Sequence, residues 1–129
     1  MSKRILIVDD SLVSRRQVRR CIEFAGFGEC TFLEASDGAS ALEMIEAGKA
    51  DVLITDLNMP VMDGLELLRA IHESGAPKPV LTIVMTSAAS TALKAELDKY
   101  QVTALITKPV SPQAFGKALA PLHTPRAQG

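Results

Sequence analysis

The sequence predicts a doubly wound α/β fold, with a five-stranded parallel sheet in the order 2-1-3-4-5 and helices on both faces. Short apolar runs alternate five times with helical patterns, which is typical of repeated strand–helix–strand units. Four of these runs are nearly continuous in Val, Ile, Leu or Thr, as expected for strands covered on both faces. With right-handed crossovers, such a chain forms a sheet of this order, and its binding crevice opens between strands 1 and 3.

The apolar runs also give the positions of the strands. The five expected strands lie at roughly residues 4–9, 31–35, 51–56, 80–86 and 102–107. Between them, apolar residues recur at helical spacing. The stripe of the first helix consists of Val18, Cys21, Ile22 and Ala25, and that of the second consists of Ala41, Leu42 and Ile45. We expect both stripes to face the core.

Residues that begin and end helices stand where the pattern needs them. Asp63 followed by Glu66 is typical of a capping box at the start of the third helix. Ser111 before Pro112 places a cap residue ahead of a proline at the first position of the fifth helix. Gly48 is a suitable end for the second helix.

Length and composition favour one cytoplasmic domain. The chain has 129 residues, 47% of them hydrophobic, so we expect a single core over residues 1–120 and a short flexible tail at 121–129. The net charge of −1 argues against nonspecific binding to nucleic acid or to an anionic membrane. No apolar stretch fits a signal peptide or a membrane span. Cys21 and Cys30 are expected to be reduced thiols, which agrees with the cytoplasm.

Polar residues end or follow four of the expected strands at one edge of the sheet. They are Asp9 and Asp10 after the first strand, Asp56 at the end of the third, Thr86 at the end of the fourth and Lys108 after the fifth. Carboxylates that converge in this way repel one another unless a hard divalent cation or a lysine neutralises them. The sequence therefore predicts a functional site at this edge.

Phosphoryl transfer to a carboxylate is the chemistry that needs this set of groups. Asp56 would be the nucleophile and would become an aspartyl phosphate. A Mg²⁺ ion held by Asp9 and Asp10 would neutralise the incoming phosphate oxygens. The Lys108 ammonium and the Thr86 hydroxyl would bind the remaining oxygens. The acceptor is already an anion, so no strong general base is required.

Three motifs in this order resemble a known family. They are ILIVDDS at residues 5–11, ASDGASAL at 35–42 and DLNMPVMDG at 56–64. The chain resembles the receiver domain of two-component response regulators, with a flavodoxin-like fold, and most resembles the stand-alone chemotaxis type. The resemblance covers roughly residues 3–120.

The resemblance implies a role for each site residue. Asp56 would be phosphorylated, and Asp10 and Asp56 would bind Mg²⁺ directly. Asp9 would bind the ion through water, and the backbone carbonyl of Asn58 would be a further ligand. Thr86 and Lys108 would sense and clamp the phosphoryl group. Such a domain is a signalling switch that catalyses its own phosphorylation and slow dephosphorylation, not an enzyme in the usual sense.

The family also implies protein partners. A histidine kinase or a histidine phosphotransfer protein would supply the phosphoryl group, and a downstream protein would dock on the face formed by residues 89–120. No output domain follows in this sequence, so a monomer that signals by diffusion and docking is expected. The roles left open are flagellar-motor control, a phosphate sink and a phosphorelay step.

The first helix carries two basic rows whose role the sequence leaves open. These rows pair Arg15 with Arg19 and Arg16 with Arg20 at a spacing of four residues. They form either a solvated face or a docking surface for an acidic partner. If they form a docking surface, replacing Arg15 and Arg19 with glutamate should slow transfer from a protein donor but not from a small phosphodonor.

The sequence departs from the family at one position. Leu105 stands where the family usually has an aromatic switch residue, so output is expected to run through the backbone of residues 87–90. A register slip of one residue would exchange the roles of Thr86 and Ser87.

Three other classes compete with the receiver interpretation. A flavin-binding protein would need a loop rich in hydroxyls and glycine after the first strand, where Asp9 and Asp10 stand. A haloacid-dehalogenase-like phosphatase would need an acid two positions after the nucleophile, where Asn58 stands. A degenerate receiver that acts as a binding scaffold is the third alternative, and the intact set of acids and lysine argues against it.

Overall fold

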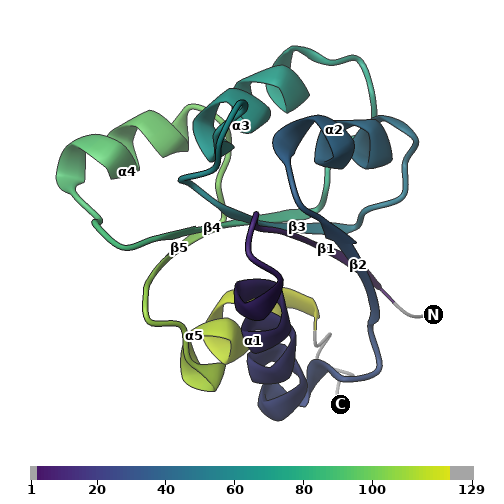
Figure 1. The fold of residues 1–129 in the computed structure, drawn as a ribbon, viewed down its shortest axis with the longest axis vertical. Helices are drawn as coiled ribbons and strands as arrows, with labels where there is room; N and C mark the ends of the chain where they lie inside the picture. The colour runs from purple at the N-terminus through teal and green to yellow at the C-terminus, as the bar shows by residue number, and fades with distance from the viewer. Residues whose placement is uncertain (1–2, 123–129) are drawn as a thin grey trace.

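Five parallel strands form one sheet in the order β2-β1-β3-β4-β5, which confirms the predicted fold class. The computed structural model describes residues 3–122. The molecule has three layers, in which α2, α3 and α4 cover one face of the sheet and α1 and α5 cover the other (Figure 1).

The elements lie close to their predicted positions. The strands are β1 (Arg4–Val8), β2 (Thr31–Ala35), β3 (Val52–Asp56), β4 (Leu81–Thr86) and β5 (Ala104–Thr107). The helices are α1 (Leu12–Ile22), α2 (Gly38–Glu46), α3 (Gly64–Glu73), α4 (Thr91–Asp98) and α5 (Pro112–Ala118). A π-helical segment, η1 (Glu23–Phe27), extends α1, and a 3₁₀ turn, η2 (Ala120–Leu122), follows α5.

Four of the strands are shorter than predicted. β5 differs most, because it begins at Ala104 and not at residue 102. Just before β5, the backbone N–H of Thr82 donates to the Thr103 side-chain hydroxyl. In a regular ladder this N–H would donate to a backbone carbonyl, so the strand pairing starts only after Thr103. β1 ends at Val8 because Asp9 already turns toward the start of α1.

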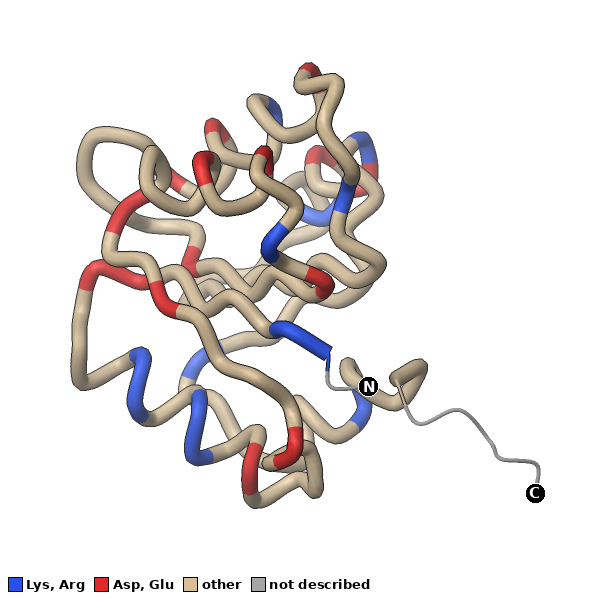
Figure 2. The backbone as a smooth tube through the Cα atoms, turned by 90° about the vertical axis from the view of Figure 1, so that its right-hand side faces the viewer, with Lys and Arg blue, Asp and Glu red and all other residues tan. Residues whose placement is uncertain are grey.

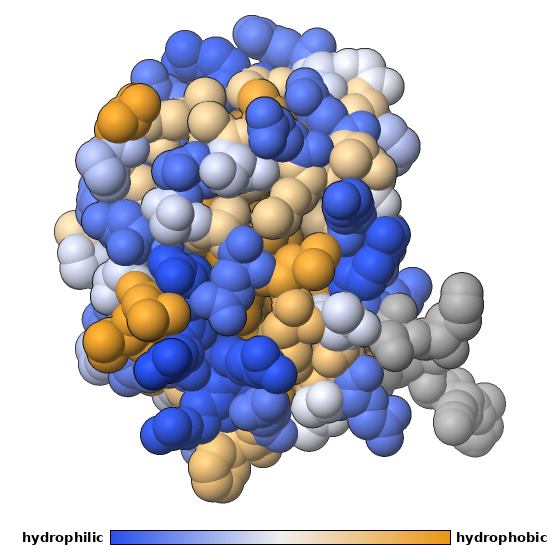
Figure 3. Space-filling view, turned by 45° about the vertical axis from the view of Figure 1, so that its right-hand side comes forward, coloured by the Kyte–Doolittle hydropathy of each residue, from blue (hydrophilic) through white to orange (hydrophobic). Residues whose placement is uncertain are grey.

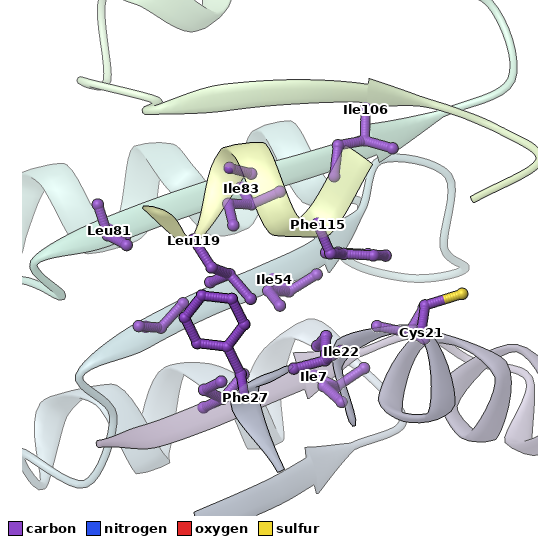
Figure 4. Packing of buried hydrophobic residues seen from close by; sticks show 14 of the residues in the cluster. Ile7, Cys21, Ile22, Phe27, Ile54, Leu81, Ile83, Ile106, Phe115 and Leu119 are labelled. Carbon is purple, nitrogen blue, oxygen red and sulfur yellow. The ribbon is translucent and has the colours of Figure 1, made fainter. Parts of the chain in front are cut away.

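Alternate side chains of the central strands point into two separate hydrophobic cores, one on each face of the sheet. Beneath α1 and α5, Ile7, Ile54 and Ile83 pack against Phe115 and Leu119 (Figure 4). On the other face, the buried cluster includes Leu6, Leu53, Val84, Leu67 and Leu97. Successive side chains of a strand point to opposite faces, so a run such as Ile5–Val8 supplies both cores.

The predicted helix boundaries are confirmed. Asp63 and Glu66 form a reciprocal capping box at α3. The Ser111 side chain caps α5, with Pro112 at its first position. Gly48 follows α2 with φ +71°, the left-handed conformation that favours glycine after a helix.

The predicted stripe of the first helix faces the core, as expected, but its last residue lies beyond the regular helix. Val18, Cys21 and Ile22 are buried in α1, but Ala25 lies in the π-helical segment, outside the regular helix. Gly26 has φ +99° in this segment, so the helical geometry ends directly after Ala25. Ala25 still packs against the core beneath α1 and α5.

The segment predicted as a tail begins inside a 3₁₀ turn. Pro121 and Leu122 belong to the 3₁₀ turn, and Leu122 packs against the core beneath α1 and α5. Residues 123–129 of that segment lie outside the described residues. Within residues 3–122, no helix has both the length and the apolar character needed to cross a bilayer.

Candidate functional site

Three carboxylates meet where β1 and β3 end. One carboxylate oxygen from each of Asp9, Asp10 and Asp56 lies within 4.8 Å of the others. Asp9 and Asp56 are buried, whereas Asp10 is exposed. β1 and β3 are neighbours in a parallel sheet, so their carboxyl ends reach the same edge. The structure therefore brings together the acids that the sequence singled out.

Lys108 supplies a positive charge to this group. Its Nζ lies 3.0 Å from Asp56 Oδ2 and 4.0 Å from Asp9 Oδ2. The Lys108 backbone N–H donates to the Thr86 carbonyl at 2.7 Å, which fixes the segment after β5 beside the end of β4. The lysine offsets part of the repulsion between the acids, but it is one cation against three carboxylates.

Asp9 is the most constrained of the three acids. Its Oδ1 accepts a hydrogen bond from the Ser11 backbone N–H at 2.9 Å. Among the described residues, its buried Oδ2 has no hydrogen-bond partner. Burial raises the pKa of Asp9, and the charges of Asp56 and Asp10 raise it further, against the opposing effects of the Ser11 N–H and Lys108. A buried, unbonded carboxylate oxygen beside two more acids fits a hard divalent cation such as Mg²⁺.

Close backbone packing positions the loop that follows Asp56. The Leu57 carbonyl accepts from the Gly64 N–H at 2.8 Å. A Cβ atom at Gly64 would lie 2.6 Å from the Asp56 carbonyl oxygen, so only glycine fits here without a shift. The exposed Asn58 lies in this loop, two positions after Asp56.

The same loop is anchored farther along by Met62. A Cβ atom at Gly38, the first residue of α2, would lie 2.8 Å from Met62, so this side chain packs directly on the helix start. Val61, just before it, is 99% exposed and has φ +68°, which is unfavourable for a β-branched residue.

The basic residues of α1 appear as blue segments in the lower part of Figure 2, and the side chains of the two rows have different environments. Arg15 is 13% exposed, and its Nε donates to Glu34 Oε1 at 2.7 Å. Arg19 lies with its guanidinium carbon 4.7 Å from the centre of the Phe32 ring. Arg15 is therefore largely enclosed against β2, whereas the Arg19 side chain remains 47% exposed, and docking by this row stays a prediction.

The second row faces solvent, since Arg16 and Arg20 are both exposed. Helical spacing alone could not distinguish the rows. The useful signal was the alternation of Phe32 and Glu34 along β2, which places an aromatic ring and a carboxylate on the side of the sheet that α1 covers.

Comparison with known proteins identifies the family. The model of the response regulator receiver domain matches residues 5–120. The chain belongs to this family. This match confirms the resemblance seen in the sequence. Receiver domains are signalling domains, so the match also argues against the flavin-binding and phosphatase alternatives.

Relatives of this receiver domain include stand-alone and longer proteins. It is 36% identical to the chemotaxis protein CheY of Pseudomonas aeruginosa over 112 residues, which cover 87% of this chain and 89% of that protein. It is 40% identical to the response regulator MprA of Mycobacterium ulcerans over 90 residues, which cover 70% of this chain but 38% of MprA.

Solved structures share the fold of this receiver domain. The chemotaxis protein CheY4 of Vibrio cholerae superposes with a TM-score of 0.81 at 30% identity, and the match covers 94% of this chain and 98% of that one. The receiver domain of the response regulator AraT of Geobacillus stearothermophilus gives a TM-score of 0.79 at 32% identity, over 99% and 98% of the two chains.

Thr86 and Leu105 occupy distinct places in this receiver domain. Thr86 ends β4 and is buried, and its Oγ1 accepts from the Ala88 N–H at 3.2 Å, whereas Ser87 is exposed. Leu105 lies in β5, partly buried against the core beneath α2, α3 and α4. The Thr86 hydroxyl is therefore bonded to the β4–α4 loop itself, and an aliphatic side chain stands at the predicted switch position.

Proposed function

We propose that this receiver domain is a Mg²⁺-dependent phosphoacceptor switch in which Asp56 takes a phosphoryl group from a histidine kinase or a histidine phosphotransfer protein. One observation carries the proposal: three carboxylates lie within 4.8 Å of one another, with the Lys108 ammonium 3.0 Å from Asp56. A structural role alone does not account for this arrangement, because burying like charges together costs stability.

The chain offers oxygen ligands suited to Mg²⁺. Asp10 and Asp56 would hold the ion directly, and Asp9 would hold it through a water molecule. The backbone carbonyl of Asn58, in the loop after Asp56, would complete the protein's ligands. When bound, the ion supplies positive charge that neutralises the oxygens of the incoming phosphoryl group. The free oxygen of the buried Asp9 supports this assignment.

Asp56 then acts as the nucleophile. One of its carboxylate oxygens forms a bond to phosphorus as the bond between phosphorus and the donor's leaving atom breaks, and the leaving group departs with the electron pair. Lys108 already contacts Asp56, so its ammonium can bind a phosphoryl oxygen with little movement. Water would later cleave the aspartyl phosphate slowly and restore the carboxylate.

Thr86 links the phosphoryl group to the rest of the domain. Its hydroxyl oxygen accepts from the Ala88 N–H, and the same hydroxyl still has a proton to donate to a phosphoryl oxygen. A shift of Thr86 toward the phosphoryl group would draw the β4–α4 loop with it. The phosphoryl group would thus favour one of two loop conformations by binding it better.

The face formed by α4, β5 and α5 is our proposed output surface. A groove of about 530 Å³ lies between β5 and α5, and its lining includes Leu105, Ser111 and Lys117. A downstream protein that docks here would sense the loop before α4, because that loop leads directly into this surface.

Intact-mass spectrometry with acetyl phosphate and Mg²⁺ tests the phosphoacceptor. The wild type should gain one phosphoryl adduct, with release of acetate, and both Asp56→Asn and a chelator should abolish it. If the folded wild type gains no adduct with Mg²⁺ present, the phosphoacceptor proposal fails and a phosphorylation-independent scaffold takes its place.

The solvent-facing row of α1 is our proposed docking surface for the phosphodonor protein. Arg16 and Arg20 are exposed, and Val13, one turn before Arg16, is 75% exposed. Figure 3 shows hydrophobic surface next to strongly hydrophilic surface on the lower part of the molecule. This combination suits a partner that offers acidic and apolar side chains together.

A charge reversal separates docking from chemistry. Arg16→Glu should slow transfer from a histidine phosphotransfer protein about tenfold or more, because it places like charges opposite each other. It should leave the reaction with acetyl phosphate unchanged. Lys49→Glu, the same charge change at an exposed position after α2, is the control and should spare both reactions. Equal slowing with both donors would contradict docking by Arg16.

A further inference from the structure

Arg15 connects the acidic site to the neighbouring strand. Its Nη1 donates to the backbone carbonyl of Asp9 at 2.6 Å, and its Nε donates to Glu34 Oε1 at 2.7 Å. We propose that Arg15 is a positioning residue that fixes the Asp9–Asp10 peptide and thereby sets the geometry of the acidic site for a divalent cation. This inference rests on the proposed Mg²⁺-dependent function.

Both backbone polar groups of Asp9 and one of its carboxylate oxygens are hydrogen-bonded. Its N–H donates to the Ala35 carbonyl at 3.2 Å, and its carboxylate accepts from the Ser11 N–H at 2.9 Å. The Arg15 guanidinium donates to the second backbone group, the carbonyl oxygen. Ser11 also caps α1 with its side chain, so the start of this helix and the acidic pair form one bonded unit.

The carbonyl contact matters for Asp10 as well. The Asp9 carbonyl and the Asp10 N–H belong to one planar peptide group, so the direction of that carbonyl determines where Asp10 begins. Among residues 3–122, no hydrogen bond holds the exposed Asp10 side chain. The position of the Asp10 carboxylate therefore depends on the peptide that Arg15 holds.

Glu34 keeps Arg15 in place. It lies on β2, opposite Ile7 of β1. Ile7 precedes Asp9 by two residues, so Glu34 lies close to the end of β1. The Arg15 side chain is 13% exposed, so it is packed between helix and sheet and has little freedom to leave the carbonyl. A planar guanidinium suits this task, because it can donate to two acceptors in fixed directions at once.

Two possible effects of Arg15 on a cation have opposite signs. If Arg15 acted only as a nearby positive charge, its removal would tighten Mg²⁺ binding by relieving repulsion. If it positions the acidic pair, its removal would weaken binding. Loss of a residue that orients metal ligands typically costs about 10- to 100-fold in affinity.

Isothermal titration calorimetry of the unphosphorylated protein with Mg²⁺ shows directly whether removal of Arg15 weakens or tightens Mg²⁺ binding. Arg15→Ala should bind Mg²⁺ about tenfold more weakly than the wild type. Arg19→Ala is the matched control: it removes the same charge one turn along the same row, where the guanidinium lies over Phe32 and does not contact Asp9. The control should keep wild-type affinity.

Variants of Glu34 test the positioning role of Arg15 independently, because Glu34 accepts the hydrogen bond that holds the Arg15 side chain. Glu34→Ala removes the acceptor that holds Arg15 and should weaken Mg²⁺ binding severalfold. Glu34→Gln removes the same charge but keeps an oxygen that can accept from Arg15, so it should retain most of the wild-type affinity. These variants carry the test if Arg15→Ala does not fold, which circular dichroism will show.

The phosphorylation rate separates positioning from general damage. With acetyl phosphate, Arg15→Ala should need more Mg²⁺ to reach half of its maximal rate, yet approach the wild-type rate at saturating Mg²⁺. Unchanged or tighter Mg²⁺ binding in Arg15→Ala would overturn the inference while leaving the phosphoacceptor proposal intact. Absence of Mg²⁺ binding by the wild type would overturn both.

Discussion

Replacing Lys108 with methionine should destabilise the domain most when no divalent cation is present. The Lys108 Nζ lies 3.0 Å from Asp56 Oδ2, and the substitution leaves three converging carboxylates without this cation. Coulomb's law gives about 5.5 kcal/mol for a pair at that distance with an effective dielectric constant of about 20, and about 1.4 kcal/mol in water.

Partial exposure reduces this estimate. The Lys108 side chain is 31% exposed, so solvent screens part of the attraction. Hydrogen bonds to charged groups contribute about 1.5 to 3 kcal/mol, and we expect a loss of about 2 kcal/mol in the free energy of unfolding. Saturating Mg²⁺ should reduce the loss below about 1 kcal/mol, because the bound ion replaces the missing charge.

Urea unfolding followed by circular dichroism provides the measurement, since the chain has no tryptophan to serve as a fluorescent probe. Lys99→Met is the control, because Lys99 pairs with Glu96 on the exposed surface and its removal should cost under about 0.5 kcal/mol. A double-mutant cycle with Asp56→Asn isolates the pair. A coupling energy near zero, or the same loss in chelator and in Mg²⁺, would refute the reasoning.

Three further predictions follow from the loop after Asp56 and from Asp9. Gly64→Ala should lower the free energy of unfolding by about 2 kcal/mol or more, because its methyl group would meet the Asp56 carbonyl oxygen at 2.6 Å. Gly75→Ala, which meets nothing within 4 Å, should be close to neutral, and equal effects would contradict the argument. Val61→Asn should raise stability by about 1 kcal/mol, because asparagine tolerates positive φ and this 99% exposed position loses no packing; an unchanged melting temperature would count against strain. Burial raises the pKa of Asp9, so protonation favours the folded state. In chelator, the wild type should therefore lose stability relative to Asp9→Asn as the pH rises from about 3.9, the pKa in the unfolded chain, through the raised pKa of the folded state. Urea unfolding at a series of pH values measures this difference. Parallel pH profiles of the two proteins would exclude the effect.

The sequence predicted the site because its main residues are placed by strand ends. Asp9, Asp56, Thr86 and Lys108 each end or follow a run of apolar residues, and a parallel sheet brings such ends to one edge. This reasoning needs only the order of the strands. It does not need any detail of side-chain packing.

The role of Arg15 could not be predicted in the same way. Its partner Glu34 lies 19 residues away, on strand β2, and four arginines on α1 look equivalent from helical spacing. Which of them turns toward β2 depends on how the helix is rotated over the sheet. The π-helical segment was missed for a related reason, since the positive φ of Gly26 is a property of the backbone that the apolar pattern does not report.

The division of the interior into two cores affects how this chain can change over evolutionary time. Core residues beneath α1 and α5 and those beneath α2, α3 and α4 lie on opposite sides of the sheet, so the stability effects of substitutions in the two sets should largely add. A lineage can therefore remodel the face that carries α4 to suit a new partner while the other face still holds the Asp9 turn in place. Divergence in partner specificity can then proceed without loss of the acidic site.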